Sequence, residues 1–222
     1  MKTVREAAPY ESKRRAMVET QLRQRGLREE RVLEAMLTVP RHEFVSPDLA
    51  FAAYDDRPLP IGESETISQP YMVAAMSAAA CVERGDKVLE VGTGCGYQAA
   101  VLAALGARVF SLERNGRLAA EARHRLTRLG YSTVEVITGD GSEGYPPGAP
   151  YNVILVTAAA PSVPSPLLDQ LADGGRLVIP VGGRENQSLK QIFKHGIEIH
   201  TRLLDPCRFV PLIGKYGWPE EQ

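Results

Sequence analysis

Three glycines, Gly92, Gly94 and Gly96, follow the apolar run "DKVLEV" and precede the helix-like stretch "GYQAAVLAAL". A glycine turn between a strand and a helix is a typical nucleotide-binding context, although such glycines can also serve tight packing alone. The dinucleotide pattern G-x-G-x-x-G would need a glycine at position 97, where the chain has Tyr97. Glu90 would repel a pyrophosphate, but it can meet an ammonium group directly or through water. The turn therefore favours a neutral nucleoside that carries an amino-acid tail.

Two further carboxylates end the next two predicted strands. Glu113 closes "ARVFSLE", about 20 residues past the glycines, where a carboxylate commonly accepts hydrogen bonds from a ribose diol. Asp140 closes "STVEVITGD" and could accept from an adenine amino group, or it could serve only the turn before Gly141. Carboxyl ends of parallel strands meet at one edge of a sheet, so these groups together indicate one ligand. They favour S-adenosylmethionine over NAD.

A hydroxyl-rich run, "GESETISQP", leads into an alanine-rich stretch that ends at Ala80. Ser68 is predicted to be the N-cap of a helix there, with Pro70 in the first turn, where its missing N–H is not needed.

The residues before this run predict a helical N-terminal region. Two helices are expected over 11–25 and 28–39, the first ending at Gly26 and the second before Pro40. Residues 40–68 show no clear period, and a long ordered loop with short pieces of structure is expected.

From Asp86 to Gly183, short apolar runs alternate with helical stretches. This alternation predicts parallel βαβ units and an α/β fold with a doubly wound, Rossmann-like, mostly parallel sheet. Residues 184–222 are rich in β-formers and are expected to finish one sheet edge with antiparallel strands. We expect a single domain over 1–222, with an N-terminal helical and lid region at 11–80, a cofactor-binding core at 86–183 and C-terminal strands at 184–222.

Composition limits the class of protein. The 222 residues are 44% hydrophobic with a net charge of −1, which gives no electrostatic reason to expect a nucleic acid or an anionic membrane as partner. Three distant cysteines and four scattered histidines make neither a disulfide framework nor a metal pattern. The N-terminus lacks a signal-like apolar run, and no stretch approaches the ~20 apolar residues of a membrane span. A cytoplasmic protein without a metal is expected.

With these residues in place, the chain resembles the class I S-adenosylmethionine-dependent methyltransferases, and within them the protein-L-isoaspartate (D-aspartate) O-methyltransferase family. The resemblance covers about residues 15–218. It rests on "VPRHEFV" (39–45), "DDRPLPIGESETISQPYMVA" (55–74), "EVGTGCGYQAAVLA" (90–103), "GDGSEGYPPGAPYNVI" (139–154), "QLADGGRLVIPVG" (170–182) and "RFVPLIGKYGW" (208–218).

The resemblance implies methyl transfer from S-adenosylmethionine to isoaspartyl, and in some cases D-aspartyl, residues of damaged proteins, leaving S-adenosylhomocysteine. It implies a monomer and an active-site serine, Ser68, that orients the substrate carboxylate without covalent chemistry. A helix start would favour that anion, because free N–H groups and the helix dipole point at it. The cofactor-binding residues implied are Thr66, Ser68, Glu90, Gly92, Gly94, Gly96, Glu113, Asp140 and Gly141. The substrate-binding residues implied are Ser68, Phe209, Val210 and Pro211.

Other interpretations remain open at this point. Methyltransferases that act on nucleic-acid bases usually carry an Asn/Asp-Pro-Pro-aromatic motif after the fourth strand, where this chain has "VTAAAP". A metal-dependent small-molecule O-methyltransferase would need clustered carboxylates. A non-catalytic scaffold of the same fold is a third possibility, since fold alone does not imply function.

Overall fold

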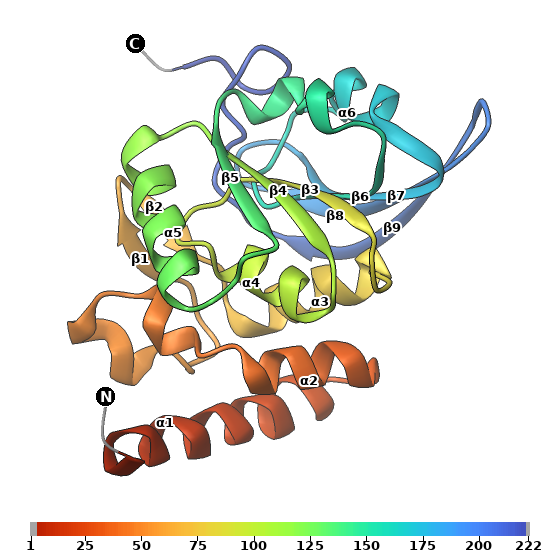
Figure 1. The fold of residues 1–222 in the computed structure, drawn as a ribbon. Coiled ribbons are helices and arrows are strands. Elements are labelled where there is room, and N and C mark those ends of the chain that lie inside the picture. Colours follow the sequence, from red (N-terminus) through yellow and green to blue (C-terminus); the bar gives the residue numbers. More distant parts are fainter. Residues whose placement is uncertain (1–3, 221–222) are drawn as a thin grey trace.

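The computed structural model describes residues 4–220, and its centre is a seven-stranded sheet in the order β5-β4-β3-β6-β7-β8-β9 (Figure 1). The first five strands in this order run parallel, and β8 and β9 are antiparallel additions at one edge. The strand bounds are β3 (Lys87–Val91), β4 (Arg108–Glu113), β5 (Val134–Thr138), β6 (Tyr151–Val156), β7 (Leu171–Gly182), β8 (Gln187–His195) and β9 (Glu198–Cys207). The predicted Rossmann-like sheet and its antiparallel C-terminal edge are confirmed.

Alternation along the strands creates two apolar faces. Successive side chains of a strand point to opposite faces, so Val88 and Leu89 of β3 belong to different hydrophobic clusters. The cluster around Val88 includes side chains from α3 (Pro70–Ala80), α4 (Tyr97–Ala104) and α5 (Gly116–Arg128). The cluster around Leu89 includes Leu167 of the short helix α6 (Ser165–Asp169). Helices therefore cover both faces of the sheet.

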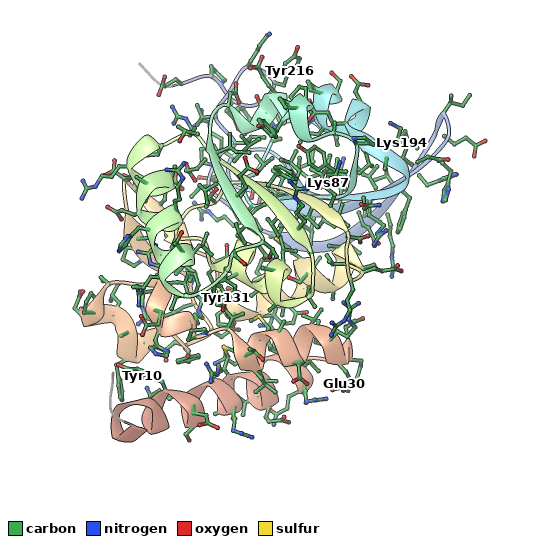
Figure 2. All side chains as sticks on the ribbon, in the orientation of Figure 1. Tyr10, Glu30, Lys87, Tyr131, Lys194 and Tyr216 are labelled. Atoms are coloured by element: carbon green, nitrogen blue, oxygen red, sulfur yellow. The ribbon has the colours of Figure 1, made fainter. Side chains whose placement is uncertain are left out.

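The N-terminal helices form an additional layer beneath α3 and α4 (Figure 1). They are α1 (Val4–Met17), continued by a π-helical turn (Val18–Arg23), and α2 (Glu30–Thr38). Leu33 and Met36 of α2 are fully buried in the same cluster as Val88, so this layer packs on the sheet face rather than forming a core of its own. Tyr131, just after α5, lies at this junction (Figure 2), with its ring centroid 6.4 Å from that of Phe44.

Residues 40–68 form the ordered, irregular connection that the sequence predicts. Two 3₁₀ turns (Arg41–Phe44 and Pro47–Ala52) precede a small hairpin of β1 (Leu59–Gly62) and β2 (Glu65–Ile67). The predicted N-cap at Ser68 is wrong: α3 begins at Pro70, and its N-cap is Gln69, which makes no side-chain capping bond. Proline fits the first helical position, and this moves the cap one residue past Ser68.

The C-terminal segment returns across the sheet after β9. Residues 209–212 run beside the end of β6, where Ala159 N–H donates to the Val210 carbonyl (2.8 Å) and Leu212 N–H donates to the Ala159 carbonyl (2.8 Å). None of the helices in the described part of the chain combines the length and apolar character needed to cross a membrane.

Candidate active site

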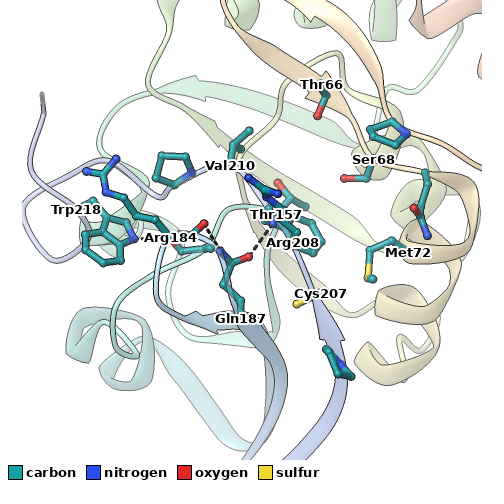
Figure 3. Close-up of a pocket in the computed structure, with 16 residues that line it drawn as sticks. Thr66, Ser68, Met72, Thr157, Arg184, Gln187, Cys207, Arg208, Val210 and Trp218 are labelled. Carbon is teal, nitrogen blue, oxygen red and sulfur yellow. Dashed lines mark hydrogen bonds between the residues drawn. The ribbon is translucent and has the colours of Figure 1, made fainter.

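A cleft of about 710 Å³ opens at the carboxyl edge of the parallel strands (Figure 3). Thr66 and Thr157 line this cleft and also the two narrower cavities that continue beneath it along the glycine turn. The cleft and cavities therefore meet at these two threonines. Parallel α/β sheets bind ligands at this edge, so the position agrees with the sequence-based expectation.

The glycine turn is held open by backbone conformations that favour glycine. Gly92, Gly94 and Gly96 have φ values of +96°, +51° and +90°. A Cβ on Gly92 would lie 2.4 Å from Oγ1 of Thr157, so the turn also needs a bare backbone for close approach to the end of β6. Gly96 faces the other way, since a Cβ there would meet Leu126 of α5 at 3.1 Å.

Glu113 both lines the cavity and fixes the glycine turn. Its Oε2 accepts from Gly94 N–H (2.9 Å), and its Oε1 accepts from Asn115 N–H (2.9 Å). Each oxygen keeps a further acceptor site, so the carboxylate can still receive hydrogen bonds from a diol. Glu65 lines the same cavity, where its burial, followed by the nearby charge of Glu113, raises its pKa.

Glu90 is fully buried below the turn and does not line the cavities. Its Oε2 accepts from the Ser111 hydroxyl, and its Oε1 has no hydrogen-bond partner within the described residues. Burial raises the pKa of Glu90 to about 8, against the opposing effect of the Ser111 hydrogen bond. Burial thus shifts Glu90 toward its protonated form.

Asp140 binds the C-terminal segment. Burial disfavours its charged form, but hydrogen bonds from Lys215 N–H (2.8 Å) and from the hydroxyl and N–H of Ser142 (2.7 and 2.8 Å) outweigh burial and lower the pKa of Asp140. Gly214 passes so close that a Cβ would lie 2.1 Å from Oδ1 of Asp140. Its neighbour Gly141, rather than Asp140 itself, lines the cavity.

Ser68 lies half-buried where the cleft meets one of the narrower cavities (Figure 3). Its hydroxyl makes no hydrogen bond with the described residues, and this leaves it available to a ligand. The start of α3 is less open to an anion than the sequence suggests, because Tyr71 N–H donates to the carboxylate of Asp56 (3.3 Å). The Ser68 hydroxyl, and not the helix end, is therefore the group offered to the cleft.

The opposite wall of the cleft carries positive charge and no carboxylate. Arg184, Arg208 and Trp218 line it, and none of the residues lining the cleft is an aspartate, glutamate or histidine. Gln187 joins the parts of this wall: its Oε1 accepts from Phe209 N–H (2.8 Å), and its Nε2 donates to the Arg184 carbonyl (2.9 Å; Figure 3).

Cys207 also lines the cleft. Burial, helped by the charge of Asp205, raises the pKa of its thiol to about 11. The thiolate needed for nucleophilic attack is therefore scarce at neutral pH.

A family model, named relatives and solved structures all relate this chain to the family that the sequence motifs resemble. The family model described as "Protein-L-isoaspartate(D-aspartate) O-methyltransferase" matches residues 12–217. The chain belongs to this family. A relative from Methanoculleus marisnigri named protein-L-isoaspartate O-methyltransferase is 54% identical over 216 residues, covering 97% of this chain and 98% of the relative. One of the same name from Koribacter versatilis is 57% identical over 205 residues, covering 92% of each chain.

Solved structures of the family share the fold. A protein-L-isoaspartate O-methyltransferase superimposes with a TM-score of 0.83 at 29% identity, covering 92% of this chain and 67% of that one. A Plasmodium falciparum structure, assigned to the same enzyme type and solved in complex with S-adenosyl-L-homocysteine, has a TM-score of 0.78 at 25% identity, covering 92% and 98%.

The structure brings most of the predicted site residues to one cleft and its cavities. Those that line them are Thr66, Ser68, Gly92, Gly94, Glu113, Gly141, Phe209, Val210 and Pro211. Glu90, Gly96 and Asp140 lie behind this lining, where they support the turn, the packing of α4 on α5 and the C-terminal segment. Their cofactor contacts stay predictions.

Thr157 is the residue that sequence reasoning missed most plainly. Its hydroxyl donates to the Gly92 carbonyl (2.7 Å), and it lines the cleft and both cavities. It follows β6 directly, so the strand-end rule that found Glu113 and Asp140 would have found Thr157 too. Gln187 carries no such signal, because its role depends on a loop 22 residues away along the chain.

The residues present fit S-adenosylmethionine, the cofactor that the family implies. Gly92 and Gly94 leave a bare backbone beside a narrow cavity, and Glu113 and Glu65 supply acceptors and negative charge suited to a diol and a cation. Across residues 4–220, no group of three or more His, Cys, Asp or Glu side chains is placed to hold a metal ion.

Proposed function

We propose that this chain transfers the methyl group of S-adenosylmethionine to the α-carboxylate of L-isoaspartyl residues in damaged proteins. Two close relatives bear the name of this activity, and both align over more than nine-tenths of the chain. The single observation that carries the proposal is the arrangement around Ser68. An unengaged hydroxyl stands between a cavity lined with carboxylates and a wall lined with arginines.

The cofactor supplies a methyl group activated by its sulfonium. The acceptor carboxylate has an ordinary pKa of about 4 and is ionised at neutral pH, so no general base is required. This agrees with a cleft that has no histidine in its lining. The task of the protein is then to align the reacting atoms, which can contribute about 7–11 kcal/mol.

Each part of the cleft has a role in that alignment. Gly92, Gly94 and Glu113 would hold the cofactor, with Thr66 at the boundary between cofactor and substrate. The Ser68 hydroxyl would donate to the α-carboxylate and direct one oxygen toward the methyl group. Phe209, Val210 and Pro211 would line the groove for the substrate backbone. One donor suffices, because a carboxylate held by many hydrogen bonds is a weaker nucleophile.

The decisive experiment uses labelled S-adenosylmethionine and two peptides that differ only in L-isoaspartate versus L-aspartate at one position. We expect label in the isoaspartyl peptide alone. Equal labelling of both, or none, would refute the proposal. Calorimetry with S-adenosylhomocysteine separates the enzyme from a non-catalytic scaffold, since the scaffold need not bind the product and the enzyme should.

Four finer points belong to the same proposal. Acceptance of D-aspartyl sites is tested by a third peptide in the same assay. A monomer is tested by sedimentation of the full chain. Location in the cytoplasm is tested by cell fractionation. The balanced net charge of −1 supports the absence of a nucleic-acid partner, which an electrophoretic shift assay checks.

A further inference from the structure

Arg41 is a cation buried without an anion. Its side chain is fully inaccessible, and no ion pair joins it to a carboxylate of the described residues. Buried charges are normally paired, because removal from water is expensive when no counter-charge compensates. A fully buried, unpaired arginine therefore calls for a reason beyond packing.

The contacts of Arg41 reach Ser68, the helix after the glycine turn, and Ala53 at the end of the second 3₁₀ turn. Nε donates to the Ala53 carbonyl (2.6 Å), and Nη2 donates to the Ser68 carbonyl (2.6 Å). The guanidinium also lies 4.8 Å from the ring centroid of Tyr97, the first residue of α4 after the turn. Nη1 is buried and has no hydrogen-bond partner among the described residues. The site therefore does not satisfy every donor of the guanidinium.

The geometry points to Arg41 as a positioning residue for Ser68. The positioning itself does not depend on the proposed function; only the role of the positioned Ser68 hydroxyl, which is to orient the substrate carboxylate, rests on that proposal. Residues 41–69 contain only short 3₁₀ turns and a small hairpin, and Gln69 makes no side-chain cap that would fix the backbone before α3. The planar fork of Arg41 joins two carbonyls of this segment at a fixed spacing, which a lysine ammonium cannot reproduce. Arg41 thereby holds the backbone from which the Ser68 hydroxyl projects.

Arg31, an exposed residue of α2, provides a control that also donates to two backbone carbonyls. Its Nη1 donates to the Val82 carbonyl (2.9 Å), and its Nη2 donates to the Leu105 carbonyl (2.7 Å). These carbonyls precede β3 and β4, at the edge of the sheet opposite the cleft. Arg31→Lys thus removes a two-carbonyl fork on an exposed arginine without reaching the site.

The first test needs no activity. Amide hydrogen exchange over residues 64–72 should become about tenfold faster in Arg41→Lys and stay unchanged in Arg31→Lys. Equal exchange in the two variants would overturn the inference even if the wild-type protein methylates isoaspartate. Faster exchange in Arg41→Lys alone would support it even if the wild-type protein failed that assay, in which case the proposed function alone is lost.

The second test asks whether Arg41 acts through Ser68. Arg41→Lys should lower kcat about tenfold per folded molecule, with the affinity for S-adenosylhomocysteine changed less than about twofold. In a Ser68→Ala background the same substitution should lower kcat by less than about twofold, because no hydroxyl remains to be positioned. Additive losses, or an equal loss in Arg31→Lys, would show that Arg41 serves stability only.

Discussion

The two ends of the cleft are built from opposite kinds of chemistry. At the cofactor end, the strand ends of the sheet present glycines and the carboxylate of Glu113, and the small hairpin adds the carboxylate of Glu65. At the substrate end, irregular segments place Arg184 and Arg208 in the lining of the cleft, and no aspartate or glutamate is among the residues that line it. A sulfonium cofactor is cationic and an isoaspartyl acceptor is anionic, so each end carries the charge opposite to the ligand proposed for it. Because of this difference, we expect that a substitution can weaken cofactor binding without affecting the substrate end, and the reverse.

The substitution expected to weaken cofactor binding most is Gly92→Ala. Alanine is strained at φ +96°, and its Cβ would lie 2.4 Å from Thr157 Oγ1. Left-handed strain costs about 1–2 kcal/mol and overpacking about 1–3 kcal/mol. We expect S-adenosylhomocysteine affinity, measured by calorimetry, to fall by more than about 100-fold.

Gly130→Ala is the matched control for this change. Gly130 has φ +83°, but a Cβ there would meet no atom within 4 Å, so the substitution tests the strain without the clash. An equal loss of affinity in both variants would mean that the close approach of Gly92 to Thr157 is unimportant.

Ser68→Ala should damage the substrate end alone. Loss of one hydrogen bond to a charged group corresponds to about 2 kcal/mol, so kcat should fall about 30-fold while cofactor affinity stays within about twofold. The unfolding temperature should not change, because Ser68 caps no helix and makes no side-chain hydrogen bond with the described residues. Ser46→Ala, at the start of a 3₁₀ turn outside the cleft, is the control. A Ser68→Ala variant with full activity per folded molecule would remove the orienting role.

Ser68 also shows how far sequence reasoning reaches. Its motif predicted that Ser68 belongs to the site, and the structure places it in the lining of the cleft. The predicted N-cap was wrong by one residue, because Gln69 and not Ser68 precedes the first turn of α3. Helix boundaries are uncertain at that scale, because Ser68 and Gln69 can each precede the first turn and only the folded backbone decides between them.

The glycine turn, Glu113 and the parallel sheet were predictable because they depend on local patterns: an apolar run, a turn and a helix in fixed order. Arg41 and Gln187 were not. Each acts on a carbonyl or an N–H far along the chain, and no residue type or spacing marks such a contact in a single sequence. Arg41 even resembles a surface arginine in its motif, "VPRHEFV", although the structure buries it completely.

The pH dependence of the free energy of unfolding tests whether Glu90, at the cofactor end, titrates near neutral pH. Its pKa is raised to about 8 in the folded chain, against an unfolded value of 4.5. Between these values the folded state holds a proton that the unfolded state lacks, so the free energy of unfolding should fall as pH rises, by at most about 1.4 kcal/mol per pH unit. The slope should vanish below about pH 4.5 and above about pH 8.

Urea unfolding of the wild type and Glu90→Gln from pH 5 to pH 8 measures this slope, with the exposed Glu135→Gln of β5 as control. The Glu90→Gln curve should lack the decline, and parallel curves for all three proteins would contradict the assignment. If the cofactor ammonium pairs with Glu90, product binding at pH 7 should also release protons, which calorimetry in buffers of different ionisation enthalpy detects.

The smallest expected effect concerns the charge of the substrate wall. Arg208 is exposed, so its attraction for an anionic peptide is screened by solvent and salt. Arg208→Gln should raise KM for an isoaspartyl peptide about threefold at low salt, leave S-adenosylhomocysteine affinity unchanged, and lose its effect near ~0.5 M salt. Arg202→Gln, exposed on β9 outside the cleft, should leave KM unchanged. A salt-independent rise in KM would mean that Arg208 contributes through steric contact with the peptide and not through its charge. A fall in product affinity would mean that the two ends of the cleft are coupled rather than separate.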